Sequence, residues 1–165
     1  MLSKTIHEAL NRQIHHEISS AYSYLAMAAW FEHQSLNGFA NWMQMQRGEE
    51  LKHAMRLYKF VLDRDGTVDL EAVEKPKSDF KTPKDVFARS LELERRNTTA
   101  IHALYALTLQ EKDYATQSHL KWFIDEQVEE EKTAHEIETL LEMVGDNKAA
   151  LLQLDQKLGQ RATTD

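Results

Sequence analysis

The stretch QRGEELKH, residues 46–53, decides the fold, because it carries polar side chains where a packed helix normally buries apolar ones. Spacings of four and three residues select Gln46, Glu50 and His53 within it. The same spacing selects apolar residues on both sides, namely Phe39, Met43, Leu57 and Phe60. Such a pattern marks the inward face of a core helix. The sequence therefore predicts a helix whose buried face, its seam, is polar only near its middle.

Three further stretches have a seam of the same kind, interrupted near the middle by Glu17, Glu94 or Glu130. These seams consist of Leu10, Ile14, Glu17, Ala21, Tyr24, Ala28 and Phe31; of Phe87, Leu91, Glu94, Thr98, Ile101, Tyr105 and Thr108; and of Thr116, Leu120, Phe123, Gln127, Glu130, Ala134, Ile137 and Leu141. Four helices with inward seams predict a four-helix bundle. Each helix then brings one glutamate to the centre of the core.

The connections between the helices define the topology. The first two predicted helices span residues 3–33 and 39–65, and a crossover over 66–82 follows. Two tight connections and one long crossover predict an all-α fold, a four-helix bundle with a short fifth C-terminal helix over 147–158. A chain of 165 residues is long enough for one substantial core, so residues 1–165 are expected to form a single domain.

Several residues mark where the predicted helices begin and end. Thr82 and Pro83 suit the N-cap and first position of the third helix, which is expected to end near Glu111. Asp113 is expected to cap the fourth helix, and Gly145 to stop it.

Glycine is scarce, so its positions carry information. Gly38, in the sequence QSLNG, is expected in the turn between the first two helices. Gly48 instead lies inside a helical pattern, where glycine costs about 1 kcal/mol relative to alanine. The chain from Arg161 onward, RATTD, is expected to be a frayed and non-basic tail.

Composition excludes several functions. The chain has no cysteine, which excludes disulfides, cysteine-ligated zinc, iron–sulfur clusters and thiol nucleophiles. A formal net charge of −7 argues against nucleic-acid binding. No apolar run approaches the ~20 residues needed to span a membrane. The N-terminal sequence MLSKTIHEAL lacks the apolar centre of a secretory signal, so a soluble, cytoplasmic protein without membrane contact is expected.

Buried glutamates require compensation, because a carboxylate buried alone is very costly. No Lys or Arg occupies any of the four seams, so pairing with basic side chains inside the core is not expected. Two divalent cations would balance the four charges of Glu17, Glu50, Glu94 and Glu130. Oxygen ligands with one imidazole, that of His53, suit iron or manganese, and zinc would bind as well.

An internal repeat supports a shared centre. Glu17 and Glu94 are 77 positions apart, and so are Glu50 and Gln127, and His53 and Glu130. The chain is therefore interpreted as two helix hairpins that each supply half of one site. Glu50 and His53 are one helical turn apart on one face, where both can bind the same cation.

Over essentially the whole chain, these residues resemble the non-haem ferritins of prokaryotes. The matching features are Glu17, Tyr24, Glu50-x-x-His53, Glu94 and Gln127-x-x-Glu130, with the crossover and the short fifth helix. This resemblance implies a ferritin-like fold and a homo-oligomeric shell of 24 subunits. It also implies a ferroxidase that oxidises Fe(II) with dioxygen or hydrogen peroxide and stores the Fe(III) mineral for iron homeostasis.

The resemblance also implies roles for individual residues. Glu17, Glu50 and His53 would hold the first of two iron ions. Glu50 would bridge to the second ion, which Glu94 and Glu130 would hold. Gln127 would border the oxygen-binding side without being a full ligand. Tyr24 would either donate a hydrogen bond to a ligand carboxylate or supply an electron during oxygen reduction.

Prokaryotic ferritins often have a third, weaker iron site, and here Glu49, Glu126 and Glu129 would form it with Glu130 shared. Glu49 and Glu126 also obey the offset of 77 residues. Haem is not expected, because Leu51 follows Glu50 where the haem-binding relatives have methionine.

The first predicted helix has a second apolar stripe, formed by Ile18, Tyr22, Leu25 and Ala29. A bundle has only one core, so this stripe is expected to face another subunit. Two other functions stay open at this point. One is a di-metal redox enzyme that removes peroxide and stores nothing. The other is a non-catalytic helical interaction module whose seam glutamates are protonated.

Overall fold

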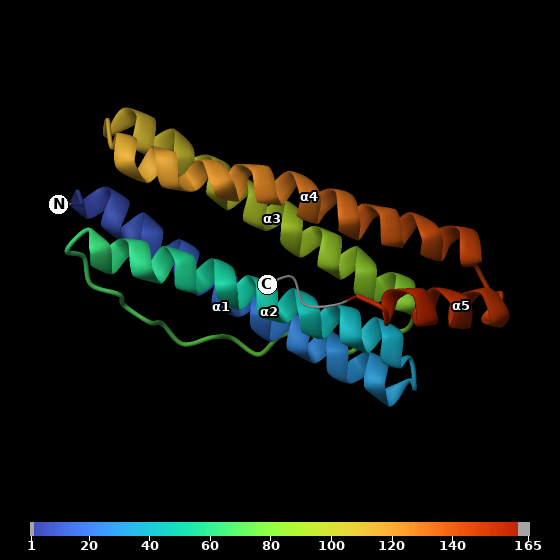
Figure 1. The fold of residues 1–165 in the computed structure, drawn as a ribbon. Helices are drawn as coiled ribbons and strands as arrows, with labels where there is room; N and C mark the ends of the chain where they lie inside the picture. The colour runs from blue at the N-terminus through green and yellow to red at the C-terminus, as the bar shows by residue number, and fades with distance from the viewer. Residues whose placement is uncertain (1, 162–165) are drawn as a thin grey trace.

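The computed structural model describes residues 2–161 of the chain. These residues form five α-helices and no strand: α1 (Lys4–His33), α2 (Asn37–Asp63), α3 (Pro83–Gln110), α4 (Tyr114–Val144) and α5 (Lys148–Leu158). The four long helices run side by side as a bundle, and the short α5 turns back across one end (Figure 1). The predicted fold class, with its crossover and short fifth helix, is therefore confirmed.

The bundle consists of two helix hairpins. α1 packs on α2, α3 packs on α4, and α1 also lies against α3. The crossover between α2 and α3 runs along the outside of the bundle from one end to the other (Figure 1). Within the described part of the chain, no Cα atoms of α2 and α4 approach within 8 Å, so only side chains bridge these two helices.

The predicted caps of α3 and α4 agree with the structure, whereas α2 begins and ends two residues earlier than the predicted range 39–65. Thr82 and Asp85 form a capping box at the start of α3, with Pro83 in its first turn. The Asp113 side chain accepts a hydrogen bond from the Thr116 backbone N–H at 3.1 Å, which caps α4. Gly145 ends α4 with a φ of 51°, a left-handed conformation that favours glycine.

Gly38 is not in a turn, contrary to the prediction, because α2 already begins at Asn37. The first turn is shorter than expected and contains Ser35 with a φ of 59°. Gly38 is required for another reason: a Cβ atom here would lie 1.7 Å from the Asp155 backbone oxygen of α5. The Asp155 Oδ1 atom also accepts the backbone N–H of Phe39 at 2.9 Å. α5 is thus fastened to the start of α2.

The core is divided into two hydrophobic clusters. One contains Phe31, Phe39 and Phe87 with their neighbours, and α5 packs against it through Leu154. The other, around Leu57, lies towards the opposite end and is built from Ile6, Leu10, Ile14, Val61, Ile101, Leu120 and Phe123 among others. The polar seam residues belong to neither cluster. The polar centre of the bundle therefore lies between two apolar blocks.

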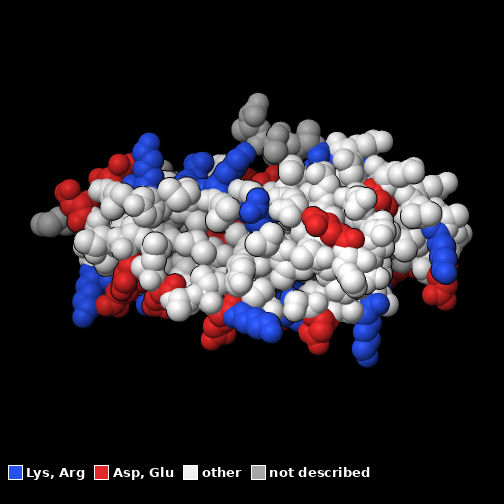
Figure 2. Space-filling model, turned by 90° about the horizontal axis from the view of Figure 1, so that it is seen from below, with Lys and Arg blue, Asp and Glu red and all other residues white. Residues whose placement is uncertain are grey.

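The second stripe of α1 is partly on the surface of the chain, with Tyr22 46% and Leu25 36% exposed. On the face shown in Figure 2, positive and negative side chains are interspersed and leave broad uncharged areas between them. The assignment of this stripe to a subunit interface stays a prediction. No helix in the described residues is both long and apolar enough to cross a membrane.

Candidate metal centre

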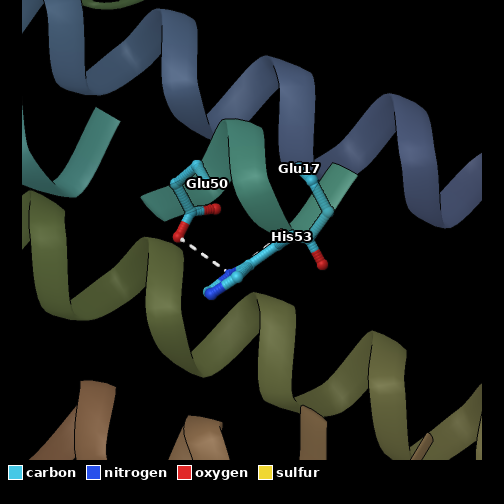
Figure 3. Close-up of side chains that lie close together, drawn as sticks. All are labelled: Glu17, Glu50 and His53. Atoms are coloured by element: carbon cyan, nitrogen blue, oxygen red, sulfur yellow. Dashed lines mark ion pairs between the residues drawn. The ribbon is translucent and has the colours of Figure 1, made fainter. Parts of the chain in front are cut away.

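Three predicted ligands meet in the polar centre. Glu17 of α1 and Glu50 and His53 of α2 each offer a ligand atom, and these atoms lie within 4.8 Å of one another. The three side chains converge between the helices (Figure 3). Glu17 and Glu50 are 0% exposed and His53 is 3% exposed. The sequence predicts that Glu50 and His53 share one face of a helix, and in the structure both side chains project from one face of α2.

His53 is a neutral imidazole in this centre. Burial and the nearby positive charge of Arg56 lower the pKa of His53 to about 4. Its Nδ1 atom lies 3.8 Å from Glu50 Oε1, along the dashed line in Figure 3, and 4.0 Å from Glu17 Oε2. Both separations exceed hydrogen-bond length. The Nδ1 atom is buried and lacks a hydrogen-bond partner among residues 2–161, so it is available as a metal ligand.

Glu50 is the least satisfied acid of the centre. Both carboxyl oxygens are buried, and no N–H or hydroxyl group in the described part of the chain donates to them, although the neighbouring Glu17 carboxyl can share a proton with Glu50. Burial, together with the charges of Glu94 and Glu17, raises the pKa of Glu50 well above its usual value. Buried polar atoms without partners are rare in proteins and call for an explanation such as an ion. The orphaned oxygens beside the free His53 Nδ1 fit a divalent cation.

Glu17 is held in place by two amides. Gln13 Nε2 donates to Glu17 Oε1 at 2.8 Å, and Asn97 Nδ2 donates to Glu17 Oε2 at 3.1 Å. Gln13 Nε2 also donates to Asn97 Oδ1 at 2.6 Å, which fixes the two amides relative to each other. Burial raises the pKa of Glu17 to about 7, although these donors act in the opposite direction.

Glu94 belongs to neither group of clustered ligand atoms found in the described residues. Its carboxyl group instead accepts hydrogen bonds from the Tyr24 hydroxyl and, at 3.4 Å, from Gln127 Nε2. Burial raises the pKa of Glu94 to about 7, and these two donors partly offset that shift. Burial also raises the pKa of Tyr24, so that its phenol remains neutral and able to donate. Tyr24 and Gln127 thus orient the glutamate of α3.

Glu130 completes the centre from α4. Gln46 Nε2 donates to Glu130 Oε2 at 2.7 Å, across the gap between α2 and α4. Burial and the charge of Glu94 raise the pKa of Glu130 to about 8. Ligand atoms of Glu130, His53 and Glu126 form a second group within 4.8 Å. His53 therefore belongs to both groups of candidate ligands.

The residues predicted for a third metal site are only partly gathered. Glu126 joins His53 and Glu130, whereas Glu129 is exposed and acts on Glu126 through its charge. Burial and the charges of Glu129 and Glu49 raise the pKa of Glu126. The Glu49 carboxylate forms an ion pair with Arg161, with 2.6 Å between Nη2 and Oε2.

The position of Arg161 contradicts two expectations from the sequence. It was expected to begin a frayed tail, but its backbone oxygen accepts a hydrogen bond from Asn41 Nδ2 at 3.2 Å. Basic side chains were not expected at the seams, yet Arg161 Nη1 donates to the seam residue Gln46. The rest of the predicted tail, residues 162–165, lies outside the described residues.

Other supporting residues were missed because single polar residues inside helices carry little signal. The repeat could have found some of them. Gln13 and Ser90 are 77 positions apart, as are Ser20 and Asn97, and all four are buried. Ser90 lies 2.9 Å from the Tyr24 hydroxyl through its Oγ atom. The sequence contains no comparable signal for Arg161.

A pocket leads from the surface to the centre between α2 and α4. It has a volume of about 490 Å³, and its lining includes His53, Glu49 and Glu126. Arg56 also lines it and lies over the Trp122 ring, 4.1 Å from the ring centre. The candidate ligands therefore face an opening on the side where the two hairpins stand apart.

A four-helix bundle with one crossover and a central cluster of glutamates and histidine is the arrangement of ferritin-like carboxylate proteins, which hold metal in the bundle core. Comparison with known proteins identifies the family. Residues 7–144 match the ferritin-like domain, and the chain belongs to that family.

Individual relatives agree over nearly the full length. The bacterial non-heme ferritin of Staphylococcus aureus (strain NCTC 8325 / PS 47) is 41% identical, across 98% of this chain and 97% of the relative. That of Staphylococcus haemolyticus (strain JCSC1435) is 38% identical, across 98% of each chain. The open pore ferritin of Archaeoglobus fulgidus superposes with a TM-score of 0.97 at 47% identity, covering 98% of this chain and 99% of that one.

Proposed function

We propose that this chain is the subunit of an iron-storage ferritin that oxidises Fe(II) at its central carboxylate site. Iron storage follows from the family and from the non-heme ferritin relatives. Oxidation is supported above all by one observation: the oxygens of Glu50 and the Nδ1 atom of His53 are buried and adjacent, and no N–H or hydroxyl group of residues 2–161 donates to them. A cation substrate that enters this gap supplies the interaction that these atoms lack.

Two Fe(II) ions are the proposed substrates. Glu17, Glu50 and His53 would hold the first ion, with Glu50 bridging to the second. Glu94 and Glu130 would complete the second position. Each Fe(II) gives up one electron, and dioxygen takes up two electrons and two protons to become hydrogen peroxide. Hydrogen peroxide is the alternative oxidant, and two electrons with two protons convert it into two water molecules.

The surrounding residues hold the glutamates for this reaction. The amides of Gln13 and Asn97 orient Glu17, whereas Gln46 orients Glu130. Tyr24 and Gln127 orient Glu94. Because the carboxyls hold protons when no ion is bound, entry of the cations releases those protons. The contact between Tyr24 and Glu94 favours a hydrogen-bonding role for Tyr24. Electron donation by Tyr24 stays a prediction.

Storage requires an assembly larger than one chain. The exposed apolar stripe on α1 supports a homo-oligomer, because isolated subunits rarely expose such surface without a partner. We propose a cytoplasmic shell of 24 subunits, each a single domain over residues 1–165, with the mineral inside. Glu49, Glu126 and Glu129 would hold a third and weaker ion with Glu130 shared, and ligand atoms of Glu126 and Glu130 already lie within 4.8 Å of each other.

The experiment is to load the protein aerobically with Fe(II), separate it by gel filtration, and measure the iron retained per chain. Retention far above two or three ions shows a stored mineral. Retention of about two ions would instead support a di-metal redox enzyme that removes peroxide. Retention near zero would contradict a metal centre and support the alternative function, a non-catalytic helical interaction module.

A further inference from the structure

Arg161 reaches back from the chain end following α5 to the α2 side of the metal centre. Its guanidinium pairs with Glu49 at 2.6 Å and also donates to the Gln46 side-chain oxygen. The guanidinium carbon lies 5.0 Å from the centre of the Trp42 ring, in a cation–π contact. Arg161 thus contacts three side chains of α2 through an ion pair, a hydrogen bond and a cation–π contact. In Figure 1 the described residues that follow α5 turn back towards α2.

These contacts are not those of a loose surface arginine. The side chains of Arg161 and Glu49 are only 26% and 18% exposed. Asn41 anchors the Arg161 backbone oxygen, and α5 is itself fixed to α2 through Asp155. Partly buried ion pairs are screened by salt less than exposed pairs are. The guanidinium is therefore held beside Glu49 by several independent interactions.

Gln46 connects Arg161 with a candidate ligand. Because Arg161 donates to the Gln46 oxygen, the Gln46 amide group is turned so that its Nε2 donates to Glu130. Glu130 shares the second ligand group with His53 and Glu126. The positive charge of Arg161 thus acts directly on Glu49 and, through one amide, on the position of Glu130.

We propose that Arg161 is a built-in competitor of the third metal ion. It neutralises Glu49 until a divalent cation, bound at Glu126 and Glu130, recruits Glu49 and displaces the guanidinium. This inference rests on the proposed metal centre. The ion must displace Arg161 before it can bind Glu49, and this competition lowers the affinity of the third site. Loss of the Arg161 contact also loosens Gln46. The third ion is therefore bound weakly and can leave the site. Arg161 is a positioning residue and does not contact the reacting iron pair.

The test compares the assembled Arg161→Gln protein with a Lys157→Gln control. Lys157 is an exposed residue of α5, and the control removes the same charge from the same chain end. Metal-free proteins are titrated calorimetrically with Zn²⁺, which has no redox chemistry here. We expect the weakest binding step to strengthen about tenfold in Arg161→Gln, with the two tighter steps changed less than about threefold. Lys157→Gln should match the wild type.

A second readout follows the displacement itself. In a background with Trp30→Phe and Trp122→Phe, Trp42 is the remaining tryptophan. Zn²⁺ occupying the weakest site should change Trp42 emission when Arg161 is present, and should leave it unchanged in Arg161→Gln. An unchanged Trp42 signal in both proteins would overturn the proposal, as would equal third-ion affinities or an equal effect of Lys157→Gln.

The outcomes also separate this proposal from the proposed function. If both proteins bind only two ions, competition at a third site is wrong while the two-ion centre remains. If Glu50→Gln binds as many ions as the wild type, the two-ion centre itself is wrong, whatever Arg161 does.

Discussion

The Oε1 atom of Glu50 lies 3.8 Å from the Nδ1 atom of His53, and neither atom has a hydrogen-bond partner among the described residues. The two side chains are one turn apart on α2 and converge on the same buried space. The pKa of His53 is about 4 and that of Glu50 is well above its usual value, so burial favours the uncharged form of both groups when no metal is bound. A cation can therefore enter by replacing protons.

Glu50→Gln should nearly abolish rapid iron oxidation. Residues that merely orient metal ligands cost about 10- to 100-fold when they are lost, so loss of a bridging ligand should slow the initial rate by more than about 100-fold. The metal-free fold should change by less than about 1 kcal/mol, because burial already favours the neutral form of Glu50, which glutamine resembles in shape. Stopped-flow absorbance and chemical denaturation measure the two effects. Glu111→Gln, at an exposed acid, is the control and should change neither.

Tyr24→Phe separates the two roles of the phenol. Loss of the hydrogen bond to Glu94 should weaken binding of the second ion about tenfold, in line with other groups that orient ligands. The fold should lose about 1 kcal/mol, the usual contribution of a hydrogen bond. Anaerobic calorimetry and denaturation measure both. Tyr105→Phe, in the half-buried part of the α3 seam, is the matched control.

A role for Tyr24 in electron donation predicts something different. Binding would then be nearly unaffected, and a radical signal seen during oxidation by the wild type would be missing from Tyr24→Phe. Freeze-quench electron paramagnetic resonance distinguishes the cases. Normal binding together with the same radical signal in the variant would contradict both roles.

The metal-free protein should lose stability as the pH rises from about 5 to about 8. The folded-state pKa values of Glu17 and Glu94 are about 7 and that of Glu130 is about 8, above the ordinary value of 4.5. These three acids therefore bind more protons in the folded state than in the unfolded state, which outweighs the opposite effect of the one histidine of the centre, His53, and the free energy of unfolding falls as the acids ionise. Denaturation in the presence of a chelator measures this trend.

Saturating Zn²⁺ should remove or reverse that pH dependence, because the cation then compensates the ionised carboxylates. Metal-free stability that rises through the same interval would show that these groups are already ionised at pH 5. The number of protons released on Zn²⁺ binding, measured in weakly buffered solution at pH 7, should be at least one per chain.

Two glycines of α2 should respond oppositely to alanine. Gly48→Ala should raise the free energy of unfolding by about 0.5–1 kcal/mol, since alanine is the better helix former and no neighbouring atom of residues 2–161 lies within 4 Å of the new Cβ. Gly38→Ala should destabilise strongly, because its Cβ would collide with the backbone of α5. Thermal unfolding of both variants measures the contrast. A destabilised Gly48→Ala would show that this position packs against another subunit.

The sequence predicts the bundle well because its seams are long and regular. All eight residues of the predicted seam in α4 are buried, and they are the buried residues of that helix. The caps at Thr82 and Asp113 are equally local signals and were also correct. Gly38 was placed wrongly because the reason for a glycine there is contact with α5, more than 100 residues further along the chain. Local sequence patterns carry no information about a contact between residues so far apart in the chain.

The candidate ligands follow the same logic. Glu17, Glu50 and His53 meet because helical spacing and a common core leave them little alternative. Glu49 instead forms an ion pair with Arg161, whose position is set by the path of the chain after α5. Asn97 is similar, since only the packing of α3 against α1 shows that its amide meets Glu17.

The division of the core into two apolar clusters has a mechanical consequence. Close-packed interiors resist changes of volume, so the blocks around Phe31 and around Leu57 act as rigid clamps at the two ends of the bundle. The glutamates between them can swing, gain protons and lose ions without disturbing that packing. The packing at the two ends therefore fixes the positions of the four helices, while the protonation of the glutamates between them changes the stability of the whole bundle.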